Sequence, residues 1–374
     1  MNVLIVAPSF PPDKTVASVR MNSLYQYLLS RHHTVYVLTN KKEQLSDMTY
    51  YVDVESYGGI KKFKDFRINQ KRYVSTFRRI LKEHPIDIVV VSGGPFYTFG
   101  IAQAAKMCGV PCILDFRDPW TFDIRGWKDM LSPMRAFTRL IQKKYERQAI
   151  CAASAVVTVT PRWKDRFVKN YPAQIEKFHL IENGFDDSLL AQVHLPEKNK
   201  LNSPLVLGVF GKLFYYTDLY SKVFLDAMKE TNIQVLQIGN REKCTNQYLK
   251  QRNIDIARLQ DTGFLPYTAG ITTLGQADAF LIIDIRKDAL GTKIYDYIWC
   301  NRPILYVGPQ DTELARLVDS FDNGFVCSNA SQVVAAIEKI QNKKLNSLGD
   351  NLQPQQFGRS VQNKKWEVLL KKLV

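Results

Sequence analysis

The residues best suited to chemistry lie in the string DALGTKIYDYIW, where Asp288 and Asp296 stand on either side of Gly291. A helix is expected to begin just after this glycine. Glycine allows another group to approach the backbone closely, and the free N–H groups at a helix start bind anions with help from the helix dipole. We therefore predict that Gly291, Thr292 and Lys293 form a cradle for a diphosphate, to which Lys293 adds a positive charge.

The two carboxylates beside this cradle are better acceptors for sugar hydroxyls than binders of phosphate, because like charges repel. Asp288 precedes the expected helix and Asp296 lies about one turn inside it, so both can reach a ligand held at the helix start. The alternative interpretation is structural: Asp288 caps the helix, and Asp296 is a solvated helix residue.

The elements that must position these residues alternate between apolar strands and helices. Continuous Val/Ile runs indicate strands buried on both faces of a parallel sheet. Strands are expected at residues 3–7, 34–39, 86–92, 111–115, 155–160, 205–210, 233–238, 279–283 and 303–307. Helices are expected around residues 97–108, 136–152, 224–229, 294–299 and 361–374.

The pattern restarts after the polar, proline-containing segment 194–204, which predicts two doubly wound α/β domains of similar size. The expected bounds are 1–195 for the first domain, 196–345 for the second and 346–374 for a helical tail that can cross back to the first. Ligands of such sheets bind beyond the carboxyl ends of the strands, so we expect the chemistry in a cleft between the domains.

Composition and missing motifs exclude several classes of protein. The 374 residues include 51 basic and 36 acidic ones, so the formal net charge of +15 favours anionic partners. The sequence has no Gly-x-Gly-x-x-Gly, Walker, HExxH or GxSxG motif. Six scattered cysteines without a Cys-x-x-Cys pair indicate reduced thiols. The start MNVLIVAP is not typical of a signal peptide, and no apolar run reaches the about 18 residues of a membrane span, so we expect a soluble or peripheral protein.

The arrangement of Asp288 and Asp296, followed by Asn301-Arg302-Pro303-Ile304, resembles the Glu-x7-Glu segment and following strand of family 4-type glycosyltransferases with GT-B architecture. Similar strings occur in the family's order at residues 11–20 (PPDKTVASVR), 92–98 (SGGPFYT), 115–120 (DFRDPW), 181–187 (IENGFDD) and 263–267 (GFLPY). The resemblance implies two Rossmann-like domains and retaining transfer of a sugar from a nucleotide-sugar donor, without an essential metal or cofactor.

For the donor, the resemblance implies a role for each matching residue. Asp288 would hold a hydroxyl of the donor sugar and Asp296 the ribose diol, while Gly291, Thr292 and Lys293 would bind the diphosphate. Two further loops of the second domain take part: Leu265 would line the nucleobase slot, and Gly211 would open the domain beside the phosphate contact Lys212.

The chain departs from the family pattern at three places. Both glutamates are aspartates, and Thr217 stands where a second phosphate-binding lysine would fall. Lys293 or Arg20 would then supply the missing charge, although Arg20 can equally be a solvated helix residue. Where many members carry a histidine after the fourth strand, this chain has the string DFRD, which contains Arg117 and Asp118.

The mechanism expected from these residues is electrostatic. The leaving nucleoside diphosphate develops negative charge, which preorganised N–H groups and cations stabilise. Lys212 and Lys293 are the candidate catalytic cations, and Asp288 is the candidate at the donor sugar. Arg117 and Asp118, which follow a strand of the first domain, are the candidates on the acceptor side; the alternative is an ion pair between them beside the strand end.

Basic residues concentrate between Lys61 and Lys82, with aromatic residues among them, and again at residues 135–147. Such clusters favour an anionic membrane surface, and a solvated helix face is the alternative; nucleic acid is not favoured because no such motif is present. We therefore expect a transferase that builds surface polysaccharide or glycolipid with a glycan or lipid-linked acceptor, in the cytoplasm or at the inner face of the membrane. A nucleotide-sugar epimerase and a degenerate subunit that assists another transferase are the alternatives.

Overall fold

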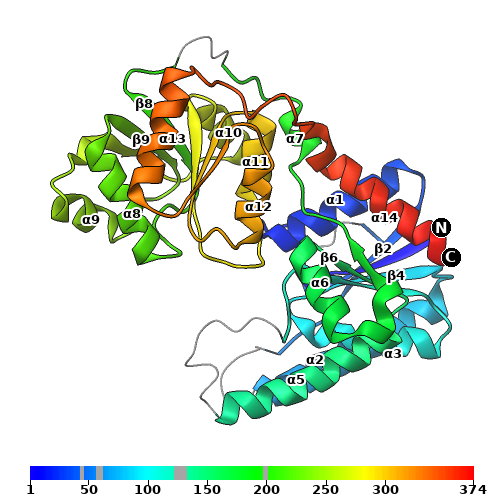
Figure 1. Cartoon of the computed structure of the whole chain (residues 1–374). Coiled ribbons are helices and arrows are strands. Elements are labelled where there is room, and N and C mark those ends of the chain that lie inside the picture. Colours follow the sequence, from blue (N-terminus) through cyan, green and yellow to red (C-terminus); the bar gives the residue numbers. More distant parts are fainter. Residues whose placement is uncertain (43–45, 56–61, 122–132, 197–200) are drawn as a thin grey trace. The chain divides into compact units, whose positions relative to one another are not determined.

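The computed structural model describes the 374-residue chain except residues 43–45, 56–61, 122–132 and 197–200. It contains two compact units (Figure 1). The first unit comprises Met1–Asn183 and Gln362–Val374, and the second comprises Gly184–Val361. Each unit is a parallel sheet covered by helices, so the predicted α/β class is confirmed.

The first unit is built on a seven-stranded parallel sheet in the order β3-β2-β1-β4-β5-β6-β7. Along β1, Val3 and Ile5 join the apolar core on one face, whereas Leu4 and Val6 join the core on the other. Both faces are therefore buried, as the continuous apolar runs predicted. The strands are β1 Asn2–Val6, β2 Thr34–Thr39, β3 Thr49–Tyr51, β4 Ile88–Ser92, β5 Cys112–Phe116, β6 Ala155–Thr158 and β7 Phe178–Leu180.

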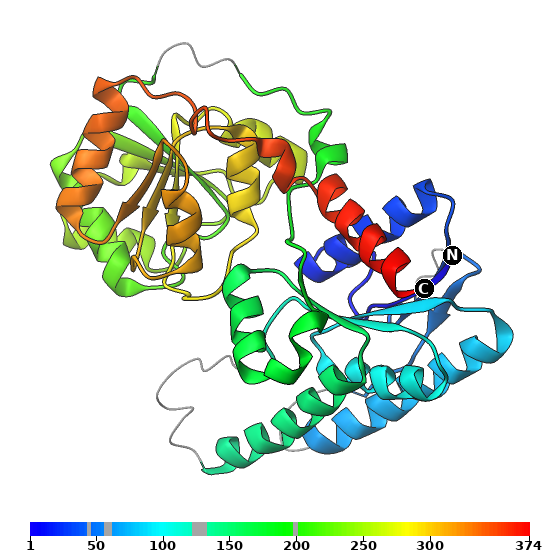
Figure 2. The same cartoon turned by 45° about the vertical axis from the view of Figure 1, so that its right-hand side comes forward.

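Helices cover the two faces of this sheet in two layers, which Figure 1 and Figure 2 show from two directions. One layer holds α2 (Lys62–Glu83), α3 (Gly100–Met107) and α5 (Pro133–Ala152), and the other holds α1 (Val16–Ser30) and α14 (Arg359–Leu373). Shorter elements complete the unit: η2 Phe96–Phe99, α6 Pro161–Asn170 and η3 Pro172–Lys177.

The second unit has a six-stranded parallel sheet in the order β10-β9-β8-β11-β12-β13. Its strands are β8 Leu205–Phe210, β9 Ile233–Ile238, β10 Leu259–Asp261, β11 Ala279–Ile283, β12 Ile304–Val307 and β13 Gly324–Cys327. Its helices are α7 Asp187–Leu190, α8 Asp218–Glu230, α9 Thr245–Gln251, α10 Tyr267–Leu274, α11 Lys293–Cys300, α12 Glu313–Asp319 and α13 Ala330–Asn342, with η4 Ile256–Arg258 and η5 Pro354–Phe357. The core on one face draws on α8, α9 and α13, and the core on the other on α10, α11 and α12.

The units divide at Asn183 and Gly184 rather than at the expected position 195. The segment after the division packs into the core of the second unit through Phe185 and Leu190, and Phe185 forms an isolated β-bridge with Gly358. The expected tail 346–374 is also split. Its residues up to position 361 belong to the second unit, whereas α14 packs Trp366 into the core of the first.

The basic stretch predicted between positions 61 and 82 is mostly helix α2, with Lys61 outside the described residues. Lys64, Arg67, Lys71, Arg78, Arg79 and Lys82 are exposed. Three of the interleaved aromatic residues, Phe66, Tyr73 and Phe77, are buried in the core instead. The expected mixed basic and aromatic surface is therefore wrong for these three side chains, because the helical period turns them toward the sheet.

Candidate active site

The loop after β8 begins with Gly211, at the carboxyl edge of the second sheet. Gly211 has a φ of +78°, and Gly239, after the neighbouring strand β9, has a φ of +143°. A Cβ atom on Gly239 would lie 3.2 Å from the Gly211 Cα, so the two loops pack backbone against backbone. The Gln237 side chain donates to the Gly211 carbonyl at 2.9 Å. Gly211 therefore leads into a well-supported turn that presents Lys212.

Lys293, the first residue of α11, lies against this loop. Its Nζ donates to the Lys212 carbonyl at 2.9 Å, so the structure brings together the two lysines that the sequence singled out. Burial lowers the pKa of Lys293 to about 8; Asp284 opposes this shift and Arg286 adds to it. Lys293 therefore loses its positive charge as the pH rises through about 8.

The start of α11 is closed by a tight backbone turn, in which the Ile294 N–H donates to the Gly291 carbonyl at 3.3 Å and the Tyr295 N–H to the Thr292 carbonyl at 3.1 Å. Thr292 occupies the N-cap position and makes no side-chain cap hydrogen bond. The expected alternative, in which Asp288 is the capping residue, is therefore wrong. Asp288 is half-buried in the loop between β11 and α11, and Gly291 lies just before Thr292.

Asp296, one turn into α11, is 8% exposed, so its interpretation as a solvated helix residue is wrong. Its Oδ1 accepts a hydrogen bond of 2.5 Å from the Tyr267 hydroxyl. Burial raises the pKa of Asp296 to about 6, against the opposing effects of this hydrogen bond and of Arg359, whereas Asp186 adds to the rise. Burial and the nearby Asp296 raise the pKa of Tyr267, so the phenol keeps its proton and acts as the donor.

Tyr267 is a functional candidate that the sequence analysis did not single out, although it ends the GFLPY string. It begins α10, two residues after Leu265. Leu265 is half-buried against the core, whereas Phe264 is 79% exposed. The loop expected to line a nucleobase slot therefore leads directly to the residue that holds Asp296.

Arg286 is a second residue that the sequence analysis missed. It pairs with buried Asp284, directly after β11, at 2.6 Å between Nη2 and Oδ2, and it lies over the Tyr216 ring at 4.3 Å. A Cβ atom on Gly291 would lie 3.0 Å from its Nη2, so the guanidinium borders the cradle. In the sequence, Arg286 could have been found as a positively charged residue shortly after the predicted strand 279–283.

Thr217, which replaces a family lysine, has a structural task in this chain. It is the N-cap residue of α8, and its hydroxyl accepts from the Tyr220 N–H at 3.4 Å. The side chain is therefore engaged in starting a helix.

In the first unit, Arg20 is buried and its guanidinium is paired. It lies on α1, is 5% exposed, and donates to both carboxylate oxygens of Asp115 at 3.0 and 3.2 Å. It also donates to the carbonyls of Ile181 and Glu182 at 2.8 and 2.6 Å. The expectation of a solvated helix residue is therefore wrong, because Asp115, distant in sequence, and these two carbonyls engage the donors of Arg20. The diphosphate contact stays a prediction.

Arg117 and Asp118 follow β5, as predicted. Arg117 is half-buried and donates to the Ser92 hydroxyl and to the carbonyls of Gly93 and Gly94, and burial lowers its pKa. Its described contacts thus hold the loop after β4 rather than form an ion pair with Asp118, which is exposed. That alternative is wrong, and the structure leaves the Asp118 carboxylate accessible to solvent.

Comparison with known proteins finds a family model that matches the first part of the chain. Residues 17–189 match the family model of Glycosyltransferase Family 4. This match covers a little under half of the 374-residue chain. No curated protein matches the sequence.

Solved structures with the same architecture span the whole chain. Anabaena HepE in complex with UDP and glucose has a TM-score of 0.67 at 16% identity, with 100% of both chains covered. The lipopolysaccharide outer core galactosyltransferase WaaB, in its apo form, has a TM-score of 0.66 at 13% identity, again with 100% of both covered. The UDP-GlcNAc 2-epimerase from Methanocaldococcus jannaschii has a TM-score of 0.61 at 13% identity and the same coverage. These likenesses show that the fold of the chain is GT-B, which transferases and an epimerase share.

None of the described helices combines the length and the apolar character that crossing a bilayer requires.

Proposed function

We propose that the protein is a glycosyltransferase that moves a sugar from a nucleoside-diphosphate sugar to a glycan or lipid-linked acceptor, with retention and without an essential metal or cofactor. The observation that carries the proposal is the grouping on α11 of a cationic cradle and a buried carboxyl. Lys293 reaches the Lys212 carbonyl beside Gly211, and Asp296 lies one turn further along the helix. HepE, which shares the fold, binds UDP and glucose in its structure.

In the proposed mechanism the cations act on the leaving group. The nucleoside diphosphate gains negative charge as the glycosidic bond breaks, and preorganised cations and N–H groups lower the barrier to this step. Lys212, Lys293 and the N–H groups after Gly291 supply this field, and Arg286 adds the charge that Thr217 does not.

The carboxylates orient the donor. Asp296, in its ionised form, accepts hydrogen bonds from the ribose diol, and Tyr267 favours that form by donating to it. Asp288 accepts from a hydroxyl of the donor sugar, and Leu265 packs against the nucleobase. On the first unit, Arg117 and Asp118 bind the acceptor.

The biological role proposed is the building of surface polysaccharide or glycolipid at the inner face of a membrane. The exposed cations of α2 support it, because each basic residue near an anionic surface contributes to binding. On α5, Phe137 and Leu140 are 63% and 68% exposed, and apolar side chains of this kind insert between headgroups.

A thermal-melt panel with UDP, GDP, ADP and CMP tests the donor site. A ligand at 100 times its dissociation constant adds about 2.7 kcal/mol, which corresponds to about 5–10 °C for a unit of this size. We expect one nucleotide to shift the wild type but not Asp296→Ala, while Asp226→Ala, an exposed carboxyl on α8, keeps the shift. If no nucleotide shifts the wild type, the proposal is wrong and the assisting-subunit alternative is favoured.

A further inference from the structure

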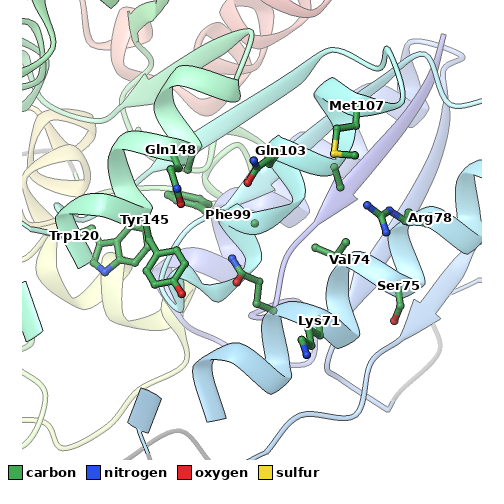
Figure 3. Close-up of a pocket in the computed structure, with 14 residues that line it drawn as sticks. Lys71, Val74, Ser75, Arg78, Phe99, Gln103, Met107, Trp120, Tyr145 and Gln148 are labelled. Atoms are coloured by element: carbon green, nitrogen blue, oxygen red, sulfur yellow. The ribbon is translucent and has the colours of Figure 1, made fainter. Parts of the chain in front are cut away.

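A groove with a volume of ≈ 370 Å³ lies in the outer helix layer of the first unit (Figure 3). It runs along α3, between α2 on one side and α5 on the other. α3 has eight residues, whereas α2 has 22 and α5 has 20. The two longer helices flank the groove, and the short α3 lies between them.

One end of the groove is aromatic. Trp120 and Tyr145 lie there together (Figure 3). The Trp120 ring stacks on Phe96, with ring centroids 4.8 Å apart and planes 7° apart, and this contact fixes its orientation. The next residue, Thr121, donates to buried Glu146 of α5 through its N–H and its hydroxyl. Trp120 is thus a fixed apolar surface, suited to pack against the C–H face of a flat, ring-shaped ligand.

Amides from all three helices line the groove: Gln70, Gln103 and Gln148. A Cβ atom at Gly100 would overlap the Gln70 side chain, so this glycine allows the Gln70 amide to lie directly on α3. A primary amide carries two donors and an acceptor. This combination matches neighbouring hydroxyl groups on a sugar ring, whereas an alkyl chain in the groove would leave the amides without partners.

The other wall is cationic. Lys71 and Arg78 of α2 are exposed and line the groove, and the residues described as lining it include no carboxylate. A guanidinium pairs with a carboxylate or phosphate through two parallel hydrogen bonds. The charge of the groove is therefore complementary to an anionic ligand.

We propose that this groove binds an acidic oligosaccharide, one that carries carboxylate or phosphate groups, as the distal part of the acceptor chain. The inference deepens the proposed function. Trp120 lies three residues after Arg117, in the same loop after β5, so the aromatic end lies toward the acceptor-side residues. Sugar rings pack on Trp120 and Tyr145, their hydroxyls bond to the amides, and their acidic groups pair with Lys71 and Arg78.

Isothermal titration of the full-length protein without nucleotide tests the groove. The probes are tetragalacturonic acid, uncharged maltotetraose and dihexanoylphosphatidylglycerol below its micelle concentration, all in 0.15 M salt. We expect the uronate to bind to the wild type. Arg78→Gln should weaken uronate binding about tenfold, and Gln103→Ala should weaken it about threefold. Arg79→Gln is the matched control, because Arg79 is an exposed cation of the same helix outside the groove.

Three outcomes overturn the inference: no uronate binding, equal weakening by Arg78→Gln and Arg79→Gln, or tighter binding of the lipid than of the uronate. Maltotetraose that binds as tightly as the uronate also overturns it, because the cations then contribute nothing. The nucleotide melts report separately on the second unit. Uronate binding without any nucleotide shift would contradict the donor proposal and leave the groove standing, and the reverse result would contradict the groove alone.

Discussion

Replacing Tyr267 with phenylalanine removes the hydroxyl that donates to Asp296 at 2.5 Å. Burial then acts on Asp296 without this opposing contribution, so its pKa must rise. A hydrogen bond to a charged group is worth about 1.5 kcal/mol, and about 1.4 kcal/mol corresponds to one pKa unit. The pKa of Asp296 should therefore rise from about 6 to about 7 in the variant.

The consequence for nucleotide binding depends on pH. If the ribose diol binds the ionised carboxylate, the affinity depends on the fraction of molecules in which Asp296 is ionised. At pH 6 this fraction is about one half in the wild type and about one in eleven in the variant, so the dissociation constant of the variant is about fivefold higher. At pH 8 both carboxyls are ionised, and the two proteins should differ by only about 1.1-fold. The sign is fixed: the affinity of each protein falls as pH falls through its own Asp296 pKa.

The assay is calorimetric titration between pH 5.5 and 8.5 with the nucleotide selected by the melts. Tyr248→Phe is the matched control, because Tyr248 donates to Asp218 at 2.6 Å on the exposed part of the same unit. A loss of equal size at every pH, or an equal loss in the control, would refute the reasoning, since Tyr267 would then act through packing and not through the charge of Asp296.

Three further predictions concern the same networks. Because burial raises the pKa of Asp296, its ionisation destabilises the fold as pH rises through about 6. Asp296→Asn should therefore raise the free energy of unfolding at pH 7.5 by about 1–3 kcal/mol, measured in denaturant titrations. The same variant should bind nucleotide more weakly. Arg286→Gln should weaken UDP about tenfold but UMP less than about twofold; equal losses would remove Arg286 from the diphosphate cradle. Arg20→Leu leaves the buried Asp115 carboxylate unpaired, so the first unit should lose about 3–5 kcal/mol of stability, with nucleotide affinity unchanged in the same titrations.

The central strands were predictable because their apolar runs are continuous. The expected ranges 34–39, 205–210, 233–238 and 279–283 coincide with β2, β8, β9 and β11. The edge strands β3, β7 and β10 have only three residues each and carry no periodicity to detect. They exist because a neighbouring strand offers its open edge, which is a property of the sheet and not of the segment.

In the candidate site, local spacing predicted the pieces but not their partners. Thr292 and Lys293 are placed by the same short string, so the start of α11 could be foreseen. The partner of Arg20 is 95 positions away, and the donor to Asp296 is 29 positions away. A charged residue in a sequence looks solvated until folding places an opposite charge or a hydroxyl beside it, which is why the buried states of Arg20 and Asp296 were missed.

The replacement of a family lysine by Thr217 at first favours a degenerate subunit, and the structure weakens that argument. Thr217 caps α8, a role worth about 1 kcal/mol, so selection for a helix start accounts for the residue type. Arg286 follows β11, whereas Thr217 follows β8. Its guanidinium borders Gly291, pairs with Asp284 and lies over the Tyr216 ring. A guanidinium braced by a buried carboxylate and an aromatic ring is more rigid than a lysine on a loop, and rigid cations are the ones that stabilise a leaving group. In the proposed function Arg286 supplies the charge that Thr217 does not, so the residue that suggests lost catalysis is compatible with an active transferase.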